Sequence, residues 1–213
     1  MKTLLTNAKV IDPVTETISD GEVMFEDGVI IPREKADETF DCQGQYICPG
    51  LIDLGVKVGE PGERHKESYK SAGAAAAAGG VTTIVTRPDT NPAIDTPEVL
   101  EFIRRRAQEV CPVNVFHMVA LTKERAGREM TEIGFLKDAG AVAFTDFTNV
   151  VKNSKILLRA LSYAKSLDAL VIGHPQDPDL SGDASATSGK FASLRGLPSV
   201  APLAERMALD RDM

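Results

Sequence analysis

Short segments of alternating apolar and polar residues open the chain, and turn signals separate them. Alternation with a period of two predicts strands, and the pairs Asp20-Gly21 and Asp27-Gly28 are typical of tight turns. The strand-like segments are residues 4–10, 22–25 and 46–47. The pattern therefore predicts a small β-sheet domain over residues 1–50.

The pattern changes after Pro49, where apolar, β-branched runs alternate with segments of helical period. This βαβα order predicts an α/β domain over residues 51–213, with a parallel sheet and right-handed crossovers. We predict strands near residues 51–58, 81–86, 113–120, 141–145 and 170–173. We predict helices near residues 66–78, 97–110, 131–138 and 154–167, and a last one from about residue 201.

Two segments between these elements have unusual compositions. Residues 71–80, SAGAAAAAGG, have small side chains that allow close packing of a helix on a strand, and the glycine pair ends the helix. Residues 174–198 are rich in Gly, Ser, Asp and Pro, which predicts a long, mobile loop. No G-x-G-x-x-G or G-x-x-x-x-G-K-[ST] motif occurs, so we expect neither a dinucleotide site nor a phosphate loop.

Composition and charge narrow the class of protein. The 213 residues are 43% hydrophobic with a net charge of −7, which is typical of a soluble globular protein. No run approaches the ~18 apolar residues of a bilayer span, and the start lacks a signal peptide pattern, so we expect a cytoplasmic protein without membrane contact. The longest basic run, Arg104-Arg105-Arg106, lies among acidic residues, which argues against nucleic-acid binding. Cys42, Cys48 and Cys111 form no C-x-x-C pair, so we expect free thiols.

Residues 49–62, PGLIDLGVKVGEPG, carry the most specific motif of the chain. This stretch resembles the first barrel strand of dihydroorotase and related cyclic amidohydrolases. In that family an Ile-Asp pair leads into His-x-His, and an arginine precedes Glu-Pro-Gly. Here Gly55 and Lys57 stand at the two histidine positions, and Gly59 stands at the arginine position. The frame of the motif is present, whereas its metal ligands are replaced.

Further segments extend the resemblance in the family's order and spacing. They are residues 66–67 with 79–83, 88–92, 140–146 and 173–177. In residues 88–92, Asp89 replaces a substrate-contacting asparagine of the family, and Arg87, just before this segment, replaces a methionine. The last two segments place Asp146 and His174 at two of the family's metal-ligand positions.

The resemblance implies a (β/α)8 barrel of TIM type, of which this chain contains about the first five βα units after the small N-terminal sheet. The roughly 160 residues after Gly50 are fewer than the roughly 200 that a complete barrel needs. We therefore expect the family's later histidine and catalytic aspartate to lie beyond residue 213. A partial barrel exposes a strand edge and apolar interior positions, so we expect self-association, a partner or a longer chain.

A zinc site at the first barrel strand is not expected. Side chains 55 and 57 point the same way because a strand has a period of two, but glycine offers no ligand and the Lys57 ammonium repels a cation. Asp146 and His174 alone would form a weak two-ligand site, whereas catalytic zinc normally takes three protein ligands and water. We expect no cofactor and assign no catalytic residue; zinc at a rearranged site is the alternative.

The altered residues also change the charges at the expected active-site end of the barrel. Gly59 and Asp89 weaken the family's grip on the carboxylate of dihydroorotate, since one removes a positive charge and the other adds a negative charge. We expect Arg87 either to turn inward and compensate or to pair with Asp89 or a nearby acid at the surface. We also expect Lys57 either to point toward Asp146 and replace the charge of the lost metal or to extend into solvent at the end of the barrel.

The two remaining histidines are expected to have structural roles only. His65 lies in a charged loop, and His117 lies in the middle of the third predicted barrel strand. Neither has a partner at ligand spacing, and a hydrogen-bonded core histidine is the default at a position such as 117.

Two functions follow from the resemblance. The first is a non-catalytic dihydroorotase-like protein of pyrimidine biosynthesis, whose retained fold supports aspartate carbamoyltransferase. The alternative is an active zinc-dependent cyclic amidohydrolase of the dihydroorotase, allantoinase or hydantoinase type, which hydrolyses a ring amide with a rearranged metal site. Zinc content and hydrolysis of dihydroorotate distinguish the two.

Overall fold

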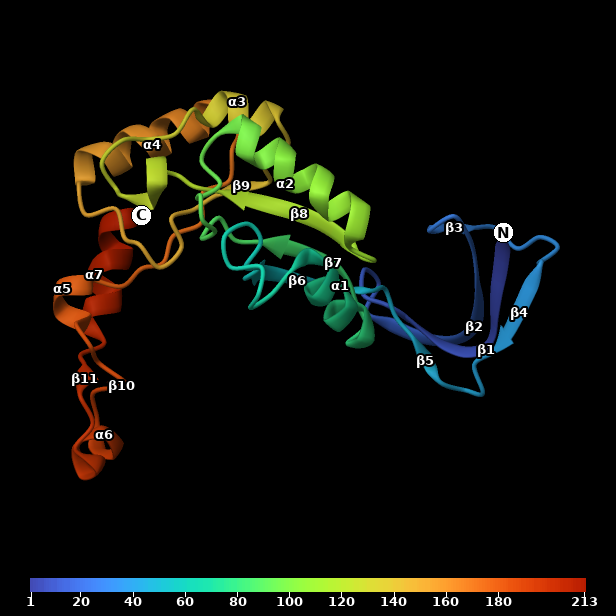
Figure 1. Ribbon diagram of the computed structural model, residues 1–213. Coiled ribbons are helices and arrows are strands. Elements are labelled where there is room, and N and C mark those ends of the chain that lie inside the picture. Colours follow the sequence, from blue (N-terminus) through green and yellow to red (C-terminus); the bar gives the residue numbers. More distant parts are fainter. The chain divides into compact units, whose positions relative to one another are not determined.

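The computed structural model describes residues 1–213, which divide into two compact units, Met1–Leu51 and Ile52–Met213 (Figure 1). The first unit contains a five-stranded sheet, and the second contains a four-stranded parallel sheet with helices between its strands. None of the helices combines the length and hydropathy of a membrane-spanning segment.

The N-terminal sheet is built on a long hairpin. Its strands are β1 (Lys2–Asp12), β2 (Thr17–Glu26), β3 (Val29–Ile31), β4 (Glu38–Asp41) and β5 (Tyr46–Ile47). β1 pairs with β2 in the antiparallel direction and with β4 and β5 in the parallel direction. The small sheet indicated by the alternating pattern is therefore present.

One of the two predicted turns in this sheet is correct. Asp27 and Gly28 have φ angles of 49° and 80° and connect β2 to β3, as expected for a tight hairpin turn. Asp20-Gly21 instead lies within β2, opposite Lys9 and Ala8. That turn prediction is wrong because pairing with the long strand β1 overrides the local preference, and a register shift follows between Leu5 and Ala8.

The second unit contains the predicted parallel sheet. Its strands are β6 (Leu51–Val56), β7 (Val81–Thr86), β8 (Asn114–Val119) and β9 (Ala143–Phe144), in the spatial order β6-β7-β8-β9. The fifth predicted strand, at 170–173, is reduced to an isolated parallel bridge between Val171 and Phe144. Only two backbone bonds, each 2.9 Å long, join it to Phe144, since β9 offers just two residues for pairing.

Helices follow the strands along the chain. They are α1 (Tyr69–Ala78), α2 (Pro97–Val110), α3 (Ile133–Asp138) and α4 (Ser154–Ser166), with a 3-10 turn η1 (Lys123–Arg125) after β8. Side chains of Ser68, Thr96 and Asn153 cap α1, α2 and α4 by accepting backbone N–H bonds. In α1 only Ala72 and Gly73 of the small-residue run are buried, so the predicted packing role holds for part of that run.

Residues after Gly173 contain more regular structure than the predicted loop. The elements are α5 (Pro178–Ser181), β10 (Ala186–Thr187), α6 (Lys190–Arg195), β11 (Ser199–Val200) and α7 (Leu203–Asp212). Asp177 caps α5 by accepting the N–H groups of Asp179 and Leu180 at 3.0 and 2.9 Å. The prediction of an irregular loop over residues 174–198 is therefore wrong for the short elements α5, β10 and α6, and a local cap stabilises the first of them.

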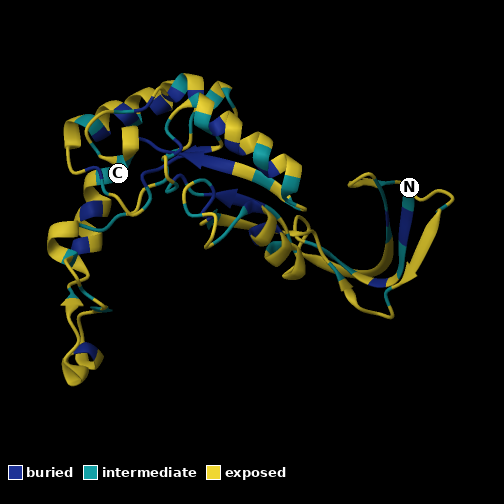
Figure 2. Cartoon of the chain, viewed as in Figure 1, coloured by how far each residue is buried: buried dark blue, intermediate teal, exposed yellow.

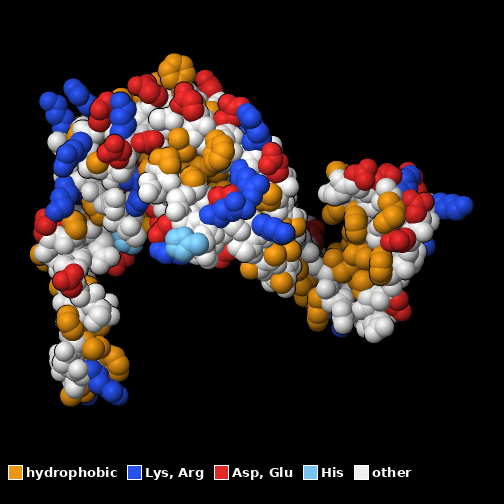
Figure 3. Space-filling model, viewed as in Figure 1, with side chains coloured by type: hydrophobic (Ala, Val, Ile, Leu, Met, Phe, Trp, Pro, Cys, Tyr) orange, Lys and Arg blue, Asp and Glu red, His pale blue; other side chains and the backbone are white.

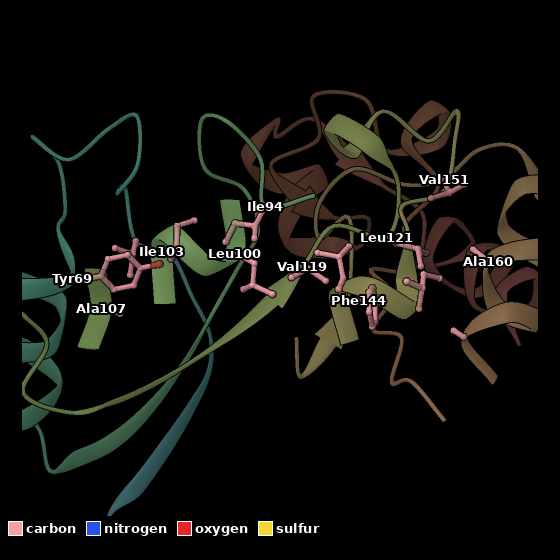
Figure 4. Close-up of a cluster of buried hydrophobic side chains, with 14 of the residues drawn as sticks. Tyr69, Ile94, Leu100, Ile103, Ala107, Val119, Leu121, Phe144, Val151 and Ala160 are labelled. Atoms are coloured by element: carbon pink, nitrogen blue, oxygen red, sulfur yellow. The ribbon is translucent and has the colours of Figure 1, made fainter. Parts of the chain in front are cut away.

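The core of the second unit lies between its sheet and its helices; Figure 2 colours the chain by burial, and Figure 4 shows side chains of this core. Its largest fully buried members are Tyr69, Ile94, Leu100, Ile103, Ile133, Leu136 and Phe144. A second, smaller cluster contains Val85, Met118 and Ala143. Met118 and Val119 are consecutive in β8, so the two clusters occupy opposite faces of the sheet.

Candidate functional site

The residues singled out in the sequence follow the carboxyl ends of the parallel strands. Lys57 follows β6, Asp89 follows β7, Asp146 follows β9, and His174 follows the bridge at Val171. The carboxyl ends of parallel strands meet at one edge of a sheet, which is where active sites lie in barrels of this architecture. The structure therefore places all four residues at one edge, which is here called the mouth.

The end of β6 carries no metal ligand. Gly55 has a φ of +85°, a conformation that side chains other than glycine rarely adopt, and a β-carbon there would lie 4.0 Å from the Phe147 ring. The Lys57 side chain is 51% exposed, and its Nζ lies 3.3 Å from Asp89 Oδ2. The cation at position 57 is thus an ion-pair partner of Asp89.

Asp89 is held mainly by Arg87. Arg87 Nε donates to Asp89 Oδ1 at 3.0 Å, and Arg87 Nη2 donates to the second carboxylate oxygen. Burial alone would raise the pKa of Asp89, but the hydrogen bond and charge of Arg87, with the charge of Lys57, lower it below its usual value. The predicted pairing of Arg87 with Asp89 is confirmed, although the side chains are only 17% and 9% exposed and do not lie on the open surface.

A stack of planar groups continues from Arg87 across the mouth. The Arg87 guanidinium lies 3.6 Å from the centroid of the Phe147 ring. The Phe147 and His174 rings are stacked with their centroids 6.3 Å apart and an angle of 21° between their planes. Residues that follow β7, β9 and the Val171 bridge are thereby in contact.

Asp146 is buried and fully engaged by the segment after β8. Its Oδ1 accepts the N–H groups of Leu121 at 3.0 Å and Thr122 at 2.9 Å, and its Oδ2 accepts the Thr122 hydroxyl. Burial raises the pKa of Asp146, and these hydrogen bonds offset part of that effect. The expected contact with Lys57 is wrong, because backbone donors satisfy this carboxylate and Lys57 pairs with the acid of the neighbouring strand, Asp89.

His174 is exposed and borders a small cavity. The cavity has a volume of 130 Å³ and is also lined by Asp146, Phe147, Asn149 and the Arg211–Asp212 ion pair. Its remaining walls come from α4 and from the segments that follow β8, β9 and the Val171 bridge, and most of them are apolar side chains. Asp146 and His174 therefore border one space; the Asp146 carboxylate is engaged by Leu121 and Thr122, whereas the His174 ring stacks on Phe147.

Position 59 leaves no room for a side chain. A β-carbon on Gly59 would lie 2.5 Å from the backbone oxygen of Glu63 and 3.0 Å from that of Glu67. The next residue, Glu60, is buried and accepts hydrogen bonds from Arg106 Nε at 2.9 Å and from the Tyr69 N–H at 3.2 Å. The loop after β6 is thus packed around a glycine, and an arginine at this position would require a different loop.

The two remaining histidines, His65 and His117, do not belong to this site. His65 is exposed, whereas His117 is 1% exposed, and its Nδ1 lies 2.8 Å from the Thr86 hydroxyl. Burial, with a smaller contribution from the charge of Arg104, lowers the pKa of His117 to about 4. His117 is therefore a hydrogen-bonded core residue, as predicted.

The residues of the mouth do not fit a catalytic zinc ion. No three His, Cys, Asp or Glu side chains in the chain are arranged to hold a metal. At the mouth itself, Gly55 near the end of β6 and Lys57 just after it offer no metal ligand. The Asp146 oxygens accept three hydrogen bonds, and two cations already neutralise Asp89. Since zinc needs several free N, O or S ligands, the chain supplies too few.

Sequence reasoning missed Phe147 and Glu60. Phe147 follows β9, and no local sequence pattern indicates that its ring contacts both Arg87 and His174. Glu60 belongs to the recognised Glu-Pro-Gly motif, and a buried carboxylate in a glycine-rich loop is a signal for a structural ion pair.

Comparison with known proteins identifies relatives of the whole chain. The family model described as "Dihydro-orotase-like" matches residues 44–210. The chain is 37% identical to the dihydroorotase of Syntrophus aciditrophicus over 220 residues, which cover 100% of this chain and 52% of that protein. It is 39% identical to a dihydroorotase-like protein of Pseudomonas putida over 212 residues, which cover 97% of this chain and 50% of that protein.

Solved structures show the same fold. The L-hydantoinase of Arthrobacter aurescens superposes with a TM-score of 0.80 at 18% identity, covering 98% of this chain and 49% of that one. The D-hydantoinase of a Thermus species gives a TM-score of 0.74 at 19% identity, covering 99% and 48%. The α/β prediction is confirmed, and the parallel sheet corresponds to half of a TIM barrel. The chain spans about half the length of the relatives it matches.

Proposed function

The chain belongs to the dihydro-orotase-like family, and we propose that it is a non-catalytic member that supports aspartate carbamoyltransferase in pyrimidine biosynthesis. The observation that carries the proposal is the end of β6, where Gly55 and Lys57 stand at the expected histidine positions and Lys57 is bound to Asp89. The retained frame of the fold, with 37% identity to a dihydroorotase, supports a role that uses the scaffold. Aspartate carbamoyltransferase as the partner is an inference from the family resemblance.

The chemistry of ring-amide hydrolysis explains why these replacements matter. Water attacks an amide at neutral pH only when its pKa is lowered, which a zinc ion accomplishes when it has an open position and suitable ligands. The mouth instead presents two ion-paired cations and a buried carboxylate occupied by backbone donors. A substrate carboxylate would also find no arginine at position 59, where the loop leaves no room for a side chain.

An active zinc-dependent cyclic amidohydrolase is the second candidate function. Asp146 and His174 favour it, because both stand at ligand positions of the family and border one cavity. Several relatives with 36–37% identity are named dihydroorotase. This candidate requires a rearranged site in which Asp146 exchanges its hydrogen bonds for a metal.

Zinc content and hydrolysis of dihydroorotate distinguish the two candidates. We expect the purified protein to contain no zinc above background after dialysis and to leave dihydroorotate intact. The Syntrophus aciditrophicus dihydroorotase, prepared in the same way, is the positive control. About one zinc ion per chain together with ring opening would contradict the non-catalytic assignment.

The partner is tested with the protein isolated from its own cells. Native mass spectrometry of that material should show the chain in a complex with aspartate carbamoyltransferase, and the complex should persist after zinc chelation. Deletion of the gene should then lower the amount or the thermal stability of the transferase. If the transferase has the same mass, abundance and melting temperature with and without this chain, the supporting role is wrong.

A further inference from the structure

At the mouth of the half barrel, side chains lie beside Gly55, where the family carries a metal ligand, and the small cavity at His174 lies next to them. We propose that Arg87 and Phe147 form a plug that occupies the metal position and joins the ends of β6, β7 and β9 in place of a metal ion. This inference rests on the proposed non-catalytic function and specifies why the site cannot be restored by its ligands alone.

The first support is the position of Phe147 against Gly55. A β-carbon at position 55 would lie 4.0 Å from Phe147 Cε2, so the Phe147 ring is the nearest group to any side chain placed there. Phe147 has a φ of 51°, which is uncommon for a bulky residue and persists only where the surroundings hold it. Its N–H donates to the Thr145 hydroxyl at 2.9 Å, which fixes the turn that directs the ring.

The second support is the fixed geometry of Arg87. One edge of its guanidinium forms the two hydrogen bonds to Asp89, and its face lies 3.6 Å from the Phe147 centroid. With 17% of its side chain exposed, the cation is largely removed from water. A planar cation in this setting favours an aromatic face and repels a second cation.

The third support is that the plug also engages His174. The Phe147 ring stacks on the His174 ring with centroids 6.3 Å apart, so the plug also contacts a residue at a ligand position. Asp146, the residue before Phe147, is turned toward Leu121 and Thr122. The positions of Phe147 in the mouth and of Asp146 against the segment after β8 therefore belong to one local arrangement of two consecutive residues.

Zinc uptake by two engineered variants tests the plug. Gly55→His/Lys57→His restores two imidazoles, so that four ligand-type side chains stand at the mouth. The second variant adds Arg87→Met and Phe147→Ala to these changes, with Asp89→Asn so that the carboxylate released from Arg87 does not become a new ligand. We expect zinc binding, measured by competition with a chromogenic chelator, to be at least about tenfold tighter in the second variant, because the substitutions at Arg87 and Phe147 remove the two side chains of the plug. The strain of a histidine at the positive φ of position 55 is common to both variants and cancels.

A matched control carries Arg87→Met, Asp89→Asn and Phe147→Ala without the two histidines and should bind no zinc, since only Asp146 and His174 remain as ligand-type side chains. If the two histidine variants bind zinc equally, the plug does not block the site and the inference is wrong. That result would leave the proposed function intact, which fails only if the unsubstituted chain binds zinc and hydrolyses dihydroorotate.

Melting temperatures test the same plug without any metal. Phe147→Ala should lower the melting temperature by several degrees, because it removes the contacts with Arg87 and His174. Phe191→Ala, at a phenylalanine that is 67% exposed, should leave it unchanged. Equal melting temperatures for the two variants would overturn the plug even if the multiply substituted chains fail to fold.

Discussion

Arg87 and Lys57 both contact Asp89, but their burial differs and so should their contributions to stability. The Arg87 side chain is 17% exposed and the Lys57 side chain is 51% exposed. Arg87→Met leaves a largely buried carboxylate with one half-exposed cation, Lys57, which we expect to cost about 2 kcal/mol of unfolding free energy. Lys57→Met should cost less than about 1 kcal/mol. Urea denaturation at pH 7 and constant ionic strength measures both.

A double-mutant cycle separates the ion pair from general damage. If Arg87 stabilises the fold through Asp89, Arg87→Met should cost less in an Asp89→Asn background than in the unsubstituted chain. Strictly additive effects would show that the two side chains act independently. The exposed pair Arg105–Glu101, 69% exposed on both sides, is the matched control and should contribute within about 0.5 kcal/mol.

His117 should make the fold sensitive to acid. Its pKa is about 4 in the folded protein and close to 6.5 in an unfolded chain. Between these values the unfolded chain binds a proton that the folded protein does not, so stability falls as the pH decreases from 6.5 toward 4. The full difference corresponds to about 3 kcal/mol. His117→Asn should flatten this part of the pH profile, whereas His65→Asn at an exposed position should not; identical slopes in all three proteins would contradict the assignment.

The chemistry of single residues was predictable where it depends on the residue itself and not where it depends on distant neighbours. The lack of a ligand at Gly55 and the pairing of Arg87 with Asp89 follow from residue type and short sequence separation. The partner of Asp146 is a backbone segment after β8, 24 residues away from it, and sequence alone does not reveal that register. Electrostatic reasoning therefore assigned Lys57 to the wrong carboxylate.

Among the elements, α1, α2 and the loop after β6 are joined by one buried carboxylate. Glu60 accepts from Arg106 of α2 and from the first N–H of α1, and its side chain is 9% exposed. Glu60→Gln keeps the shape but weakens both bonds, so we expect a loss of about 2 kcal/mol and faster amide exchange in the first turn of α1. Glu101→Gln on the exposed face of α2 should change neither. Unchanged exchange at Tyr69 in Glu60→Gln would show that this link is dispensable.

Element prediction succeeded where the local signals agree. The β7 strand and α2 have the predicted boundaries, Val81–Thr86 and Pro97–Val110, because a β-branched run and a Thr-Pro cap specify them locally. The fifth strand failed because a parallel strand depends on the length of its neighbour, and β9 has two residues. The short helices α5 and α6 lie in a segment whose composition suggested only a loop.

At the scale of the whole molecule, the second unit presents apolar positions at the edge of its sheet. β6 is the last strand of the order β6-β7-β8-β9, and its residues Ile52 and Leu54 are 65% and 68% exposed. Figure 3 shows further hydrophobic side chains on the surface of the chain. An edge strand with apolar side chains offers backbone groups and apolar area together, which favours pairing with another chain.

We therefore predict that the purified chain self-associates at micromolar concentration unless a partner covers this edge. Light scattering coupled to size exclusion should give a mass above that of one 22.8 kDa chain. Leu54→Lys should shift the distribution toward the monomer, because a charged edge residue opposes strand addition. Phe135→Lys on α3, at a side chain that is also 68% exposed, should have no such effect. A monomer that melts cooperatively without either substitution would show that this edge is already protected and would contradict the prediction.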